Sequence, residues 1–120
     1  MKKIIKKILR ESDFDWMEKV KYSEGGEHLI ELIDSCEKVE TEKYTKYVKN
    51  GNIYFLQFDE NKNIIFDYYR VSSPLGTKFN LDEKGINSLV QSVFENHYNI
   101  KGYKCLTIGM DLNLLVGSIK

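Results

Sequence analysis

The sequence predicts an α+β domain in which an antiparallel sheet packs against amphipathic helices. We expect the sheet to combine a three-stranded meander with C-terminal strands, so that the elements follow the order ααβββαββ. Two observations support this. Apolar residues recur with a helical period before residue 42 and again over residues 80–99, and with the two-residue period of strands between residues 42 and 71. The strand-like region also contains Asn50-Gly51, a dipeptide typical of tight hairpins.

Length and composition fit a single domain, residues 1–120. Of the 120 residues, 42% are hydrophobic, which is enough for a modest packed core and too much for a disordered chain. Within the domain we expect residues 1–20 to form a basic helix followed by an anchor segment. Residues 27–120 are expected to form the α+β core.

Charged residues are segregated along the chain, although their sum is zero. Residues 1–10 carry five positive charges and no negative one, and residues 11–42 carry eleven negative and three positive charges. Residues 43–120 carry ten positive and seven negative charges. The net charge of zero excludes a uniformly basic nucleic-acid binder, but it permits a local basic patch.

The first predicted element is a short basic helix over residues 2–10. Its apolar residues recur at the spacing of one helical face, and cations surround them. Residues 11–20 alternate acidic with apolar side chains, which fits either a turn and a short helix or an extended hydrophobic anchor. The apolar residues of the first helix are Ile4, Ile5, Ile8 and Leu9.

A second helix is predicted from Glu27 to about Cys36. Gly25-Gly26 is expected to break the chain just before it. One face of the predicted helix is apolar and the opposite face is acidic. The acidic residues are Glu27, Glu31 and Asp34.

Three strands are predicted next, over residues 44–49, 52–58 and 64–71. The middle strand is apolar on both faces, so we expect helices of this chain or a partner to cover both. Strict alternation would place Ile53 and Phe55 on one face. It would place Tyr54, Leu56 and Phe58 on the other.

The C-terminal third is predicted to hold one helix and two strands. Residues 71–80 contain the only proline, Pro74, and are expected to be a loop. Asn80 is expected to cap a helix that has Glu83 as its capping-box residue and ends near residue 99. Strands are predicted over residues 103–108 and 112–119.

The sequence predicts a cytoplasmic protein without a membrane span. No apolar run approaches the roughly 20 residues needed to cross a bilayer. The start lacks the uninterrupted apolar region of a signal peptide, so we expect no cleaved leader. Cys36 and Cys105 are far apart and match no metal-binding spacing, which favours reduced, buried thiols.

Residue types suited to catalysis are scarce in the sequence. His28 and His97 are the only side chains whose ordinary pKa lies near neutrality. His97 is expected at a helix end, where it interacts with the helix dipole. His28 lies among glutamates, a pattern that suits either a metal ligand or, as we favour, a solvated helix face. Nucleophile and phosphate-loop motifs are missing, so we expect a non-enzymatic protein without cofactor or metal.

Residues 2–20, KKIIKKILRESDFDWMEKV, resemble the opening segment of small uncharacterised bacteriophage proteins. The shared features are a Lys-rich amphipathic helix, an ILRE-like turn and an acidic segment with an F-x-W pair. Here Phe14 and Trp16 form that pair. The resemblance covers about a sixth of the chain and implies a phage product acting in the host cytosol. Proteins with this segment share no activity, so the resemblance assigns no functional residue.

Protein–protein interaction is the function that we predict from the charge segregation. The protein would block a host factor or defence system, or serve as a minor virion or assembly component, with a host protein, a virion protein or a second copy as its partner. The expected contacts comprise a basic set, an aromatic pair and an acidic patch. They are Lys2, Lys3, Lys6, Lys7 and Arg10, then Phe14 and Trp16, then Glu27, Glu31 and Asp34.

The alternative function is binding of single-stranded nucleic acid by the predicted sheet. Eight of the fifteen aromatic residues lie between residues 44 and 69, in a stretch that also carries several basic residues. Exposed rings can stack on bases while cations contact phosphates. The residues predicted for this alternative are Tyr44, Lys46, Tyr47, Lys49, Tyr54, Tyr68 and Arg70.

Overall fold

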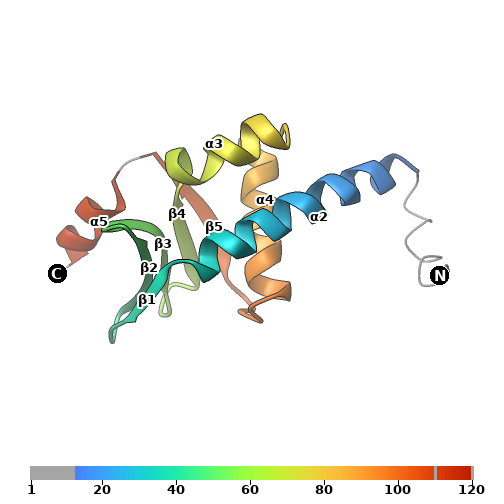
Figure 1. Ribbon diagram of the computed structural model, residues 1–120. Coiled ribbons are helices and arrows are strands. Elements are labelled where there is room, and N and C mark those ends of the chain that lie inside the picture. Colours follow the sequence, from blue (N-terminus) through green and yellow to red (C-terminus); the bar gives the residue numbers. More distant parts are fainter. Residues whose placement is uncertain (1–12, 110, 120) are drawn as a thin grey trace.

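The computed structural model describes residues 13–109 and 111–119, with side chains described from residue 24 onward. The described chain is an α+β fold with four helices and a five-stranded sheet (Figure 1). In chain order the elements are α2 (Asp13–Asp34), β1 (Glu37–Glu40), β2 (Tyr44–Lys49), β3 (Asn52–Phe58), β4 (Asn63–Asp67), α3 (Tyr68–Lys78), α4 (Glu83–Asn96), β5 (Lys104–Ile108) and α5 (Leu112–Ile119).

The sheet has the order β1-β2-β3-β4-β5, and its first four strands form an antiparallel meander. The predicted α+β class is therefore confirmed, but the element order and strand count differ. β5 pairs with β4 in parallel rather than antiparallel fashion. Two helices, α3 and α4, connect these strands, and such a crossover returns the chain to the end of the sheet where β4 began.

Helices cover both faces of the sheet. α2, α3 and α4 pack on one face, over a core that includes the fully buried Phe55, Phe66 and Phe94. α5 packs on the other face, where Leu112 and Val116 contribute to a smaller core. Figure 1 shows this separation, with α5 on one side of the strands and α2 and α4 on the other. The expectation that β3 is covered on both faces is confirmed, and both covers belong to this chain.

A bulge in β3 changes which residues share a face. Tyr47 is paired with Phe55 while Val48 is paired with Ile53, so Tyr54 is an extra residue. An extra residue reverses the alternation that follows it. Ile53 therefore packs in the α5 core, while Phe55 packs in the α2–α4 core. The predicted pairing of these two residues on one face was wrong for this reason.

The predicted chain break at Gly25-Gly26 was also wrong, because both glycines lie inside α2. The two are buried against α4, and a Cβ atom at Gly25 would lie 3.1 Å from Leu89 Cδ2. The small residues thus permit close approach of two helices instead of ending one. The ambiguity over residues 11–20 is settled from Asp13 onward, where the backbone is helical.

A helix, α3, occupies most of the segment predicted to be a strand end and a loop. Asp67 ends β4 and caps α3 by accepting a hydrogen bond from the Arg70 amide at 3.2 Å. Pro74 lies inside α3, where it removes one backbone donor. Burial of Val71 and Leu75 on one side of the helix offsets that loss.

The start of α4 differs from the predicted cap by two residues. Asp82 is the N-cap, and its carboxylate accepts from the Gly85 amide at 2.8 Å. Asn80 instead adopts a left-handed conformation with φ of 55° as α3 ends. The expected position of His97 is confirmed, since it caps the C-terminus of α4.

The segment 112–119 forms helix α5, not the predicted strand. Its apolar residues Leu112 and Val116 are four positions apart, so both point to the sheet from one helical face. β1 was missed altogether, because its sequence Glu-Lys-Val-Glu is charged and largely exposed.

Candidate interaction surface

The outer side of α2 carries a line of exposed carboxylates. Glu24, Glu27, Glu31 and Asp34 recur at intervals of three and four residues, which places them on one helical face. Gly25, Gly26, Leu29 and Ile33 occupy the opposite face and are buried. The core contacts of α2 therefore fix the direction in which its acidic face points.

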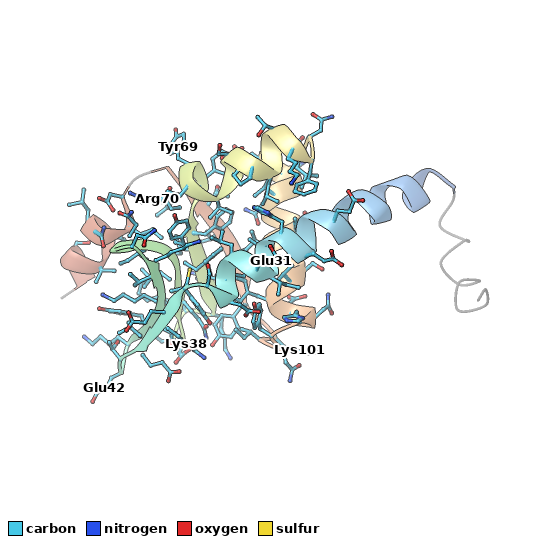
Figure 2. All side chains as sticks on the ribbon, viewed as in Figure 1. Glu31, Lys38, Glu42, Tyr69, Arg70 and Lys101 are labelled. Atoms are coloured by element: carbon cyan, nitrogen blue, oxygen red, sulfur yellow. The ribbon has the colours of Figure 1, made fainter. Side chains whose placement is uncertain are left out.

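The acidic surface continues into β1 and the turn after it. Glu37, Glu40 and Glu42 are exposed, and the one lysine among them, Lys38, has its Nζ 3.4 Å from Glu40 Oε2. Between residues 24 and 42 there are thus seven exposed carboxylates and one ammonium group. We call this set the acidic strip: Glu24, Glu27, Glu31, Asp34, Glu37, Glu40 and Glu42. Figure 2 shows Glu31 on α2, and Lys38 and Glu42 beside the sheet edge where β1 lies.

Asp34, in the middle of the acidic strip, accepts a hydrogen bond from a residue that follows the C-terminal end of α4. The Tyr98 hydroxyl donates to Asp34 Oδ1 at 2.7 Å. Partial burial of the phenol, this hydrogen bond and the nearby carboxylate charge all raise the pKa of Tyr98 above its usual value. Tyr98 therefore remains a neutral donor across the physiological pH range and fixes the end of α2 against the body of the domain.

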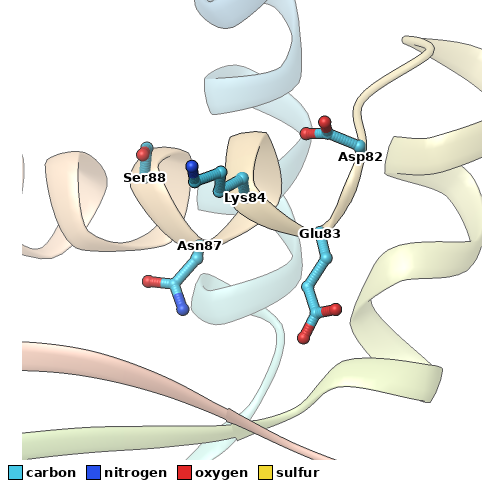
Figure 3. A pocket seen from close by; sticks show the side chains of 5 residues that line it. All are labelled: Asp82, Glu83, Lys84, Asn87 and Ser88. Atoms are coloured by element: carbon cyan, nitrogen blue, oxygen red, sulfur yellow. The ribbon is translucent and has the colours of Figure 1, made fainter.

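A shallow hollow lies at the start of α4. Asp82, Glu83, Lys84, Asn87 and Ser88 line it (Figure 3), and four of these five residues are exposed. The two carboxylates already have structural partners. Asp82 caps the helix, and Glu83 accepts from the Thr107 hydroxyl at 3.0 Å. The hollow therefore offers no buried polar group aimed at a ligand.

Cys105 is buried, His28 and Cys36 are half-buried, and His97 is exposed, so the expected burial of both thiols is correct for Cys105 alone. The His28 ring lies 5.9 Å from that of Phe79, and the His97 ring lies 4.7 Å from that of Tyr98. Burial raises the pKa of the Cys105 thiol to about 12, with a further contribution from Glu95. Both cysteines are free thiols. Within the described residues, no group of three or more His, Cys, Asp or Glu side chains is arranged to hold a metal ion.

Comparisons with protein-family models, curated proteins and solved structures find no match to this chain. The resemblance of residues 2–20 to phage proteins therefore stays a prediction. A separate observation concerns membranes: among the described helices, none is both long and apolar enough to cross a bilayer.

The structure brings together part of the predicted protein-binding set. Glu27, Glu31 and Asp34 share the exposed face of α2, as predicted. Phe14 and Trp16 lie on the first turns of the same helix, but their side chains fall outside the described part. The basic set falls wholly outside the described residues. It comprises Lys2, Lys3, Lys6, Lys7 and Arg10.

The aromatic residues of the nucleic-acid alternative are distributed over both sheet faces and packed by protein. Tyr44 is 7% exposed in the α5 core, and Tyr47 is 6% exposed in the α2–α4 core. Tyr54 and Tyr68 are half-buried against the α2–α4 core. Among the cations, Lys46 and Lys49 are half-buried, and Arg70 forms an ion pair with the buried Asp67. These residues do not form one exposed stacking face.

Sequence reasoning named three of the seven residues in the acidic strip. The four that it missed are Glu24, Glu37, Glu40 and Glu42. The excess of negative charge over residues 11–42 was a signal for all of them. Their common surface depends on two structural features that the sequence pattern does not show: α2 continues through Gly25-Gly26, and β1 follows it directly.

Proposed function

We propose that this chain is a non-enzymatic protein-binding module whose acidic strip contacts a basic surface of a partner protein. The observation that supports the proposal is the exposure of seven carboxylates between residues 24 and 42, a stretch in which Lys38 is the one lysine and after which Lys43 follows. In the absence of a partner, such a cluster costs free energy through repulsion between like charges. A cationic partner would relieve that cost.

The packing of α2 supports the same proposal. The helix presents its acidic face on a backbone that is anchored by Leu29 and Ile33, which are 0% and 3% exposed. A rigid array of charges steers a complementary partner and fixes its orientation. Blocking a host factor, or joining an assembly, is the role that this arrangement would serve in a phage-derived protein.

Neutralising the acidic strip tests the proposal. The double variant Glu27→Gln, Glu31→Gln removes two exposed charges, and we expect the dissociation constant for the partner to rise about 2- to 5-fold per carboxylate at low salt. The partner would be recovered from bacterial lysate with the wild-type chain as bait, identified by mass spectrometry, and then titrated with each purified variant. The difference between wild type and variant should shrink as salt is added.

A matched control removes the same charge elsewhere. Glu60 and Asp111 are exposed carboxylates outside the acidic strip, and the variant Glu60→Gln, Asp111→Asn should bind like the wild type. Asp111→Asn keeps an oxygen able to accept the Asn113 amide hydrogen bond. Equal binding by all three proteins, or a partner with an acidic surface, would contradict the proposal.

A further inference from the structure

β5 forms one end of the described sheet, with β4 as its only neighbour there. An edge strand presents unpaired backbone N–H and C=O groups, and charged side chains commonly protect such edges from pairing. β1, at the opposite end of the strand order, has charged residues at three of its four positions. β5 has the sequence Lys-Cys-Leu-Thr-Ile, so Lys104 is its one charged residue. The β5 edge therefore lacks most of this protection.

The parallel register identifies the backbone groups that β5 presents. The Lys104 amide donates to the Lys62 carbonyl at 2.7 Å, which directs the backbone groups of Lys104 toward β4. Alternate residues of a strand direct their backbone groups to the same side, so those of Leu106 also point toward β4. The N–H and C=O groups of Cys105 and Thr107 point the other way, toward the edge.

The α5-side face of β5 carries an exposed leucine. Leu106 and Ile108 are two residues apart and therefore lie on one face of the strand. Ile108 packs against the α5 core, whereas Leu106 is 37% exposed, because α5 packs over β3 and not over the sheet edge. A hydrophobic side chain exposed on an edge strand favours pairing with another strand.

A second copy of this chain would satisfy both features through one two-fold axis. Antiparallel pairing of two β5 strands, centred on Leu106, places Cys105 opposite Thr107 of the partner subunit as a hydrogen-bonded pair. Every outward N–H and C=O group of these residues then has a partner. The two Leu106 side chains meet on the axis in a non-hydrogen-bonded pair. Lys104 lies opposite Ile108 of the partner subunit, so no like charges face one another.

Neighbouring residues favour this register over the adjacent ones. The Tyr103 carbonyl already accepts from Gln91 Nε2 at 3.2 Å, and the chain bends at Gly109, directly after β5. Pairing centred one residue earlier would need the Tyr103 carbonyl. Pairing centred one residue later would need extended backbone at Gly109. Centring on Leu106 needs neither.

We propose that this chain forms a symmetric dimer in which two β5 strands pair antiparallel about Leu106, joining the two five-stranded sheets into one. The same surface is used on both copies, so the assembly closes as a dimer and does not grow into a filament. The dimer uses the end of the strand order opposite to β1. It does not depend on the acidic strip and stands apart from the proposed function.

An engineered disulfide tests the register. The Cα atoms of a non-hydrogen-bonded antiparallel pair lie about 4.5 Å apart, within the range of about 4.4–6.8 Å that disulfide geometry accepts. Leu106→Cys should therefore give a covalent dimer under mild oxidation, seen on a non-reducing gel. Leu114→Cys is the matched control, because Leu114 is more exposed, at 67%, but lies on α5.

The control chain should stay largely monomeric under the same oxidation. Wild type, treated alongside, measures the contribution of the native thiols Cys36 and Cys105. Equal cross-linking of Leu106→Cys and Leu114→Cys would overturn the proposed register, because it would indicate random collision and not a fixed pair.

Sedimentation equilibrium without oxidant measures the association itself. The mass of wild type should rise from 14.1 kDa toward twice that value with concentration. Leu106→Lys places two ammonium groups opposite one another and removes apolar contact, so the dimer dissociation constant should rise about 10-fold or more. Leu114→Lys makes the same change away from the edge and should dimerise like wild type. Circular dichroism checks that both variants retain the fold.

Two results would overturn the dimer. One is a wild-type chain that stays monomeric up to about 1 mM, which corresponds to a binding free energy weaker than about 4 kcal/mol. The other is a dimer that forms equally well with Leu106→Lys, because its interface would then lie elsewhere.

Amide hydrogen exchange, followed by NMR, locates the contact on the backbone. At high concentration the amides of Cys105 and Thr107 should exchange more slowly in wild type than in Leu106→Lys. The Leu106 amide points toward β4 in the monomer and serves as the internal reference. A wild-type dimer in which the Cys105 and Thr107 amides gain no protection would contradict strand pairing at β5.

Discussion

At the scale of single residues, Gly25 and Gly26 show how small side chains fix the placement of the acidic strip. Both lie on the buried face of α2, opposite Glu24 and Glu27. A Cβ on Gly25 would meet Leu89 Cδ2 at 3.1 Å, whereas one on Gly26 would meet Leu89 and Val93 methyl groups at 3.8 Å. The first distance is shorter than ordinary van der Waals contact, and the second is ordinary. The two glycines therefore differ in what they contribute.

This difference yields a paired prediction. Gly26→Ala should raise the free energy of unfolding by about 0.5–1 kcal/mol, because alanine restricts the unfolded chain and favours helix without crowding α4. Gly25→Ala should gain less than Gly26→Ala or lose stability, because Leu89, itself only 4% exposed, must move. Urea denaturation of both variants measures the difference. A larger gain at Gly25 would show that α2 and α4 leave room for a methyl group beside Leu89.

At the scale of elements, the predicted helices and strands were correct where the local sequence pattern was strong. β2 and β3 have the predicted bounds, because alternation and the Asn50-Gly51 turn agree there. Both turn residues have positive φ, of 54° and 81°, as a primed hairpin turn requires. The segment 112–119 failed because a short apolar run fits a strand or a helix equally by composition. The packing of Leu112 and Val116 against the sheet is what favours the helix over the strand.

The same limit applies to the candidate surface. Its helical half was predictable, since Glu27, Glu31 and Asp34 follow helical spacing. Its β1 half was not, because Glu37 and Glu40 lie in a strand with almost no apolar pattern. The parallel pairing of β4 with β5 could not be predicted either, since it depends on the crossover through α3 and α4 and not on any feature of β5 itself.

One side-chain hydrogen bond between elements gives a pH prediction. Tyr98 joins the end of α4 to Asp34 on α2, and Tyr98→Phe should lower the free energy of unfolding by about 0.5–1.5 kcal/mol at pH 7. The pKa of Tyr98 is raised in the folded state, so the stabilisation is complete below the unfolded pKa of about 10. It is lost as pH rises through the higher, folded pKa.

Urea unfolding of wild type and Tyr98→Phe, at pH 7 and at increasing alkaline pH, measures this loss of stabilisation. Because the variant lacks the ionisable phenol, the gap between the two proteins should narrow only above about pH 10. A gap that is constant with pH would mean that the hydroxyl does not donate to Asp34.

At the scale of the whole molecule, helices cover the two faces of the sheet to different extents. Among the described helices, α2, α3 and α4 pack on one face, while the eight-residue α5 packs on the other. That short helix shields Ile53, Leu56 and Phe58, which are at most 9% exposed. The meander that carries β1 therefore depends on a C-terminal segment distant from it in sequence.

A matched pair on α5 tests this dependence. Leu112 is 0% exposed, and Leu112→Ala should lower the free energy of unfolding by about 2–5 kcal/mol, because it removes buried apolar surface and leaves a cavity over β3. Leu114 lies on the same helix but is 67% exposed, so Leu114→Ala makes the same chemical change with an expected effect within about 0.5 kcal/mol. Thermal and urea unfolding measure both. Similar losses in the two variants would mean that α5 contributes through helix formation and not through its contact with the sheet, and the second core would then need another account.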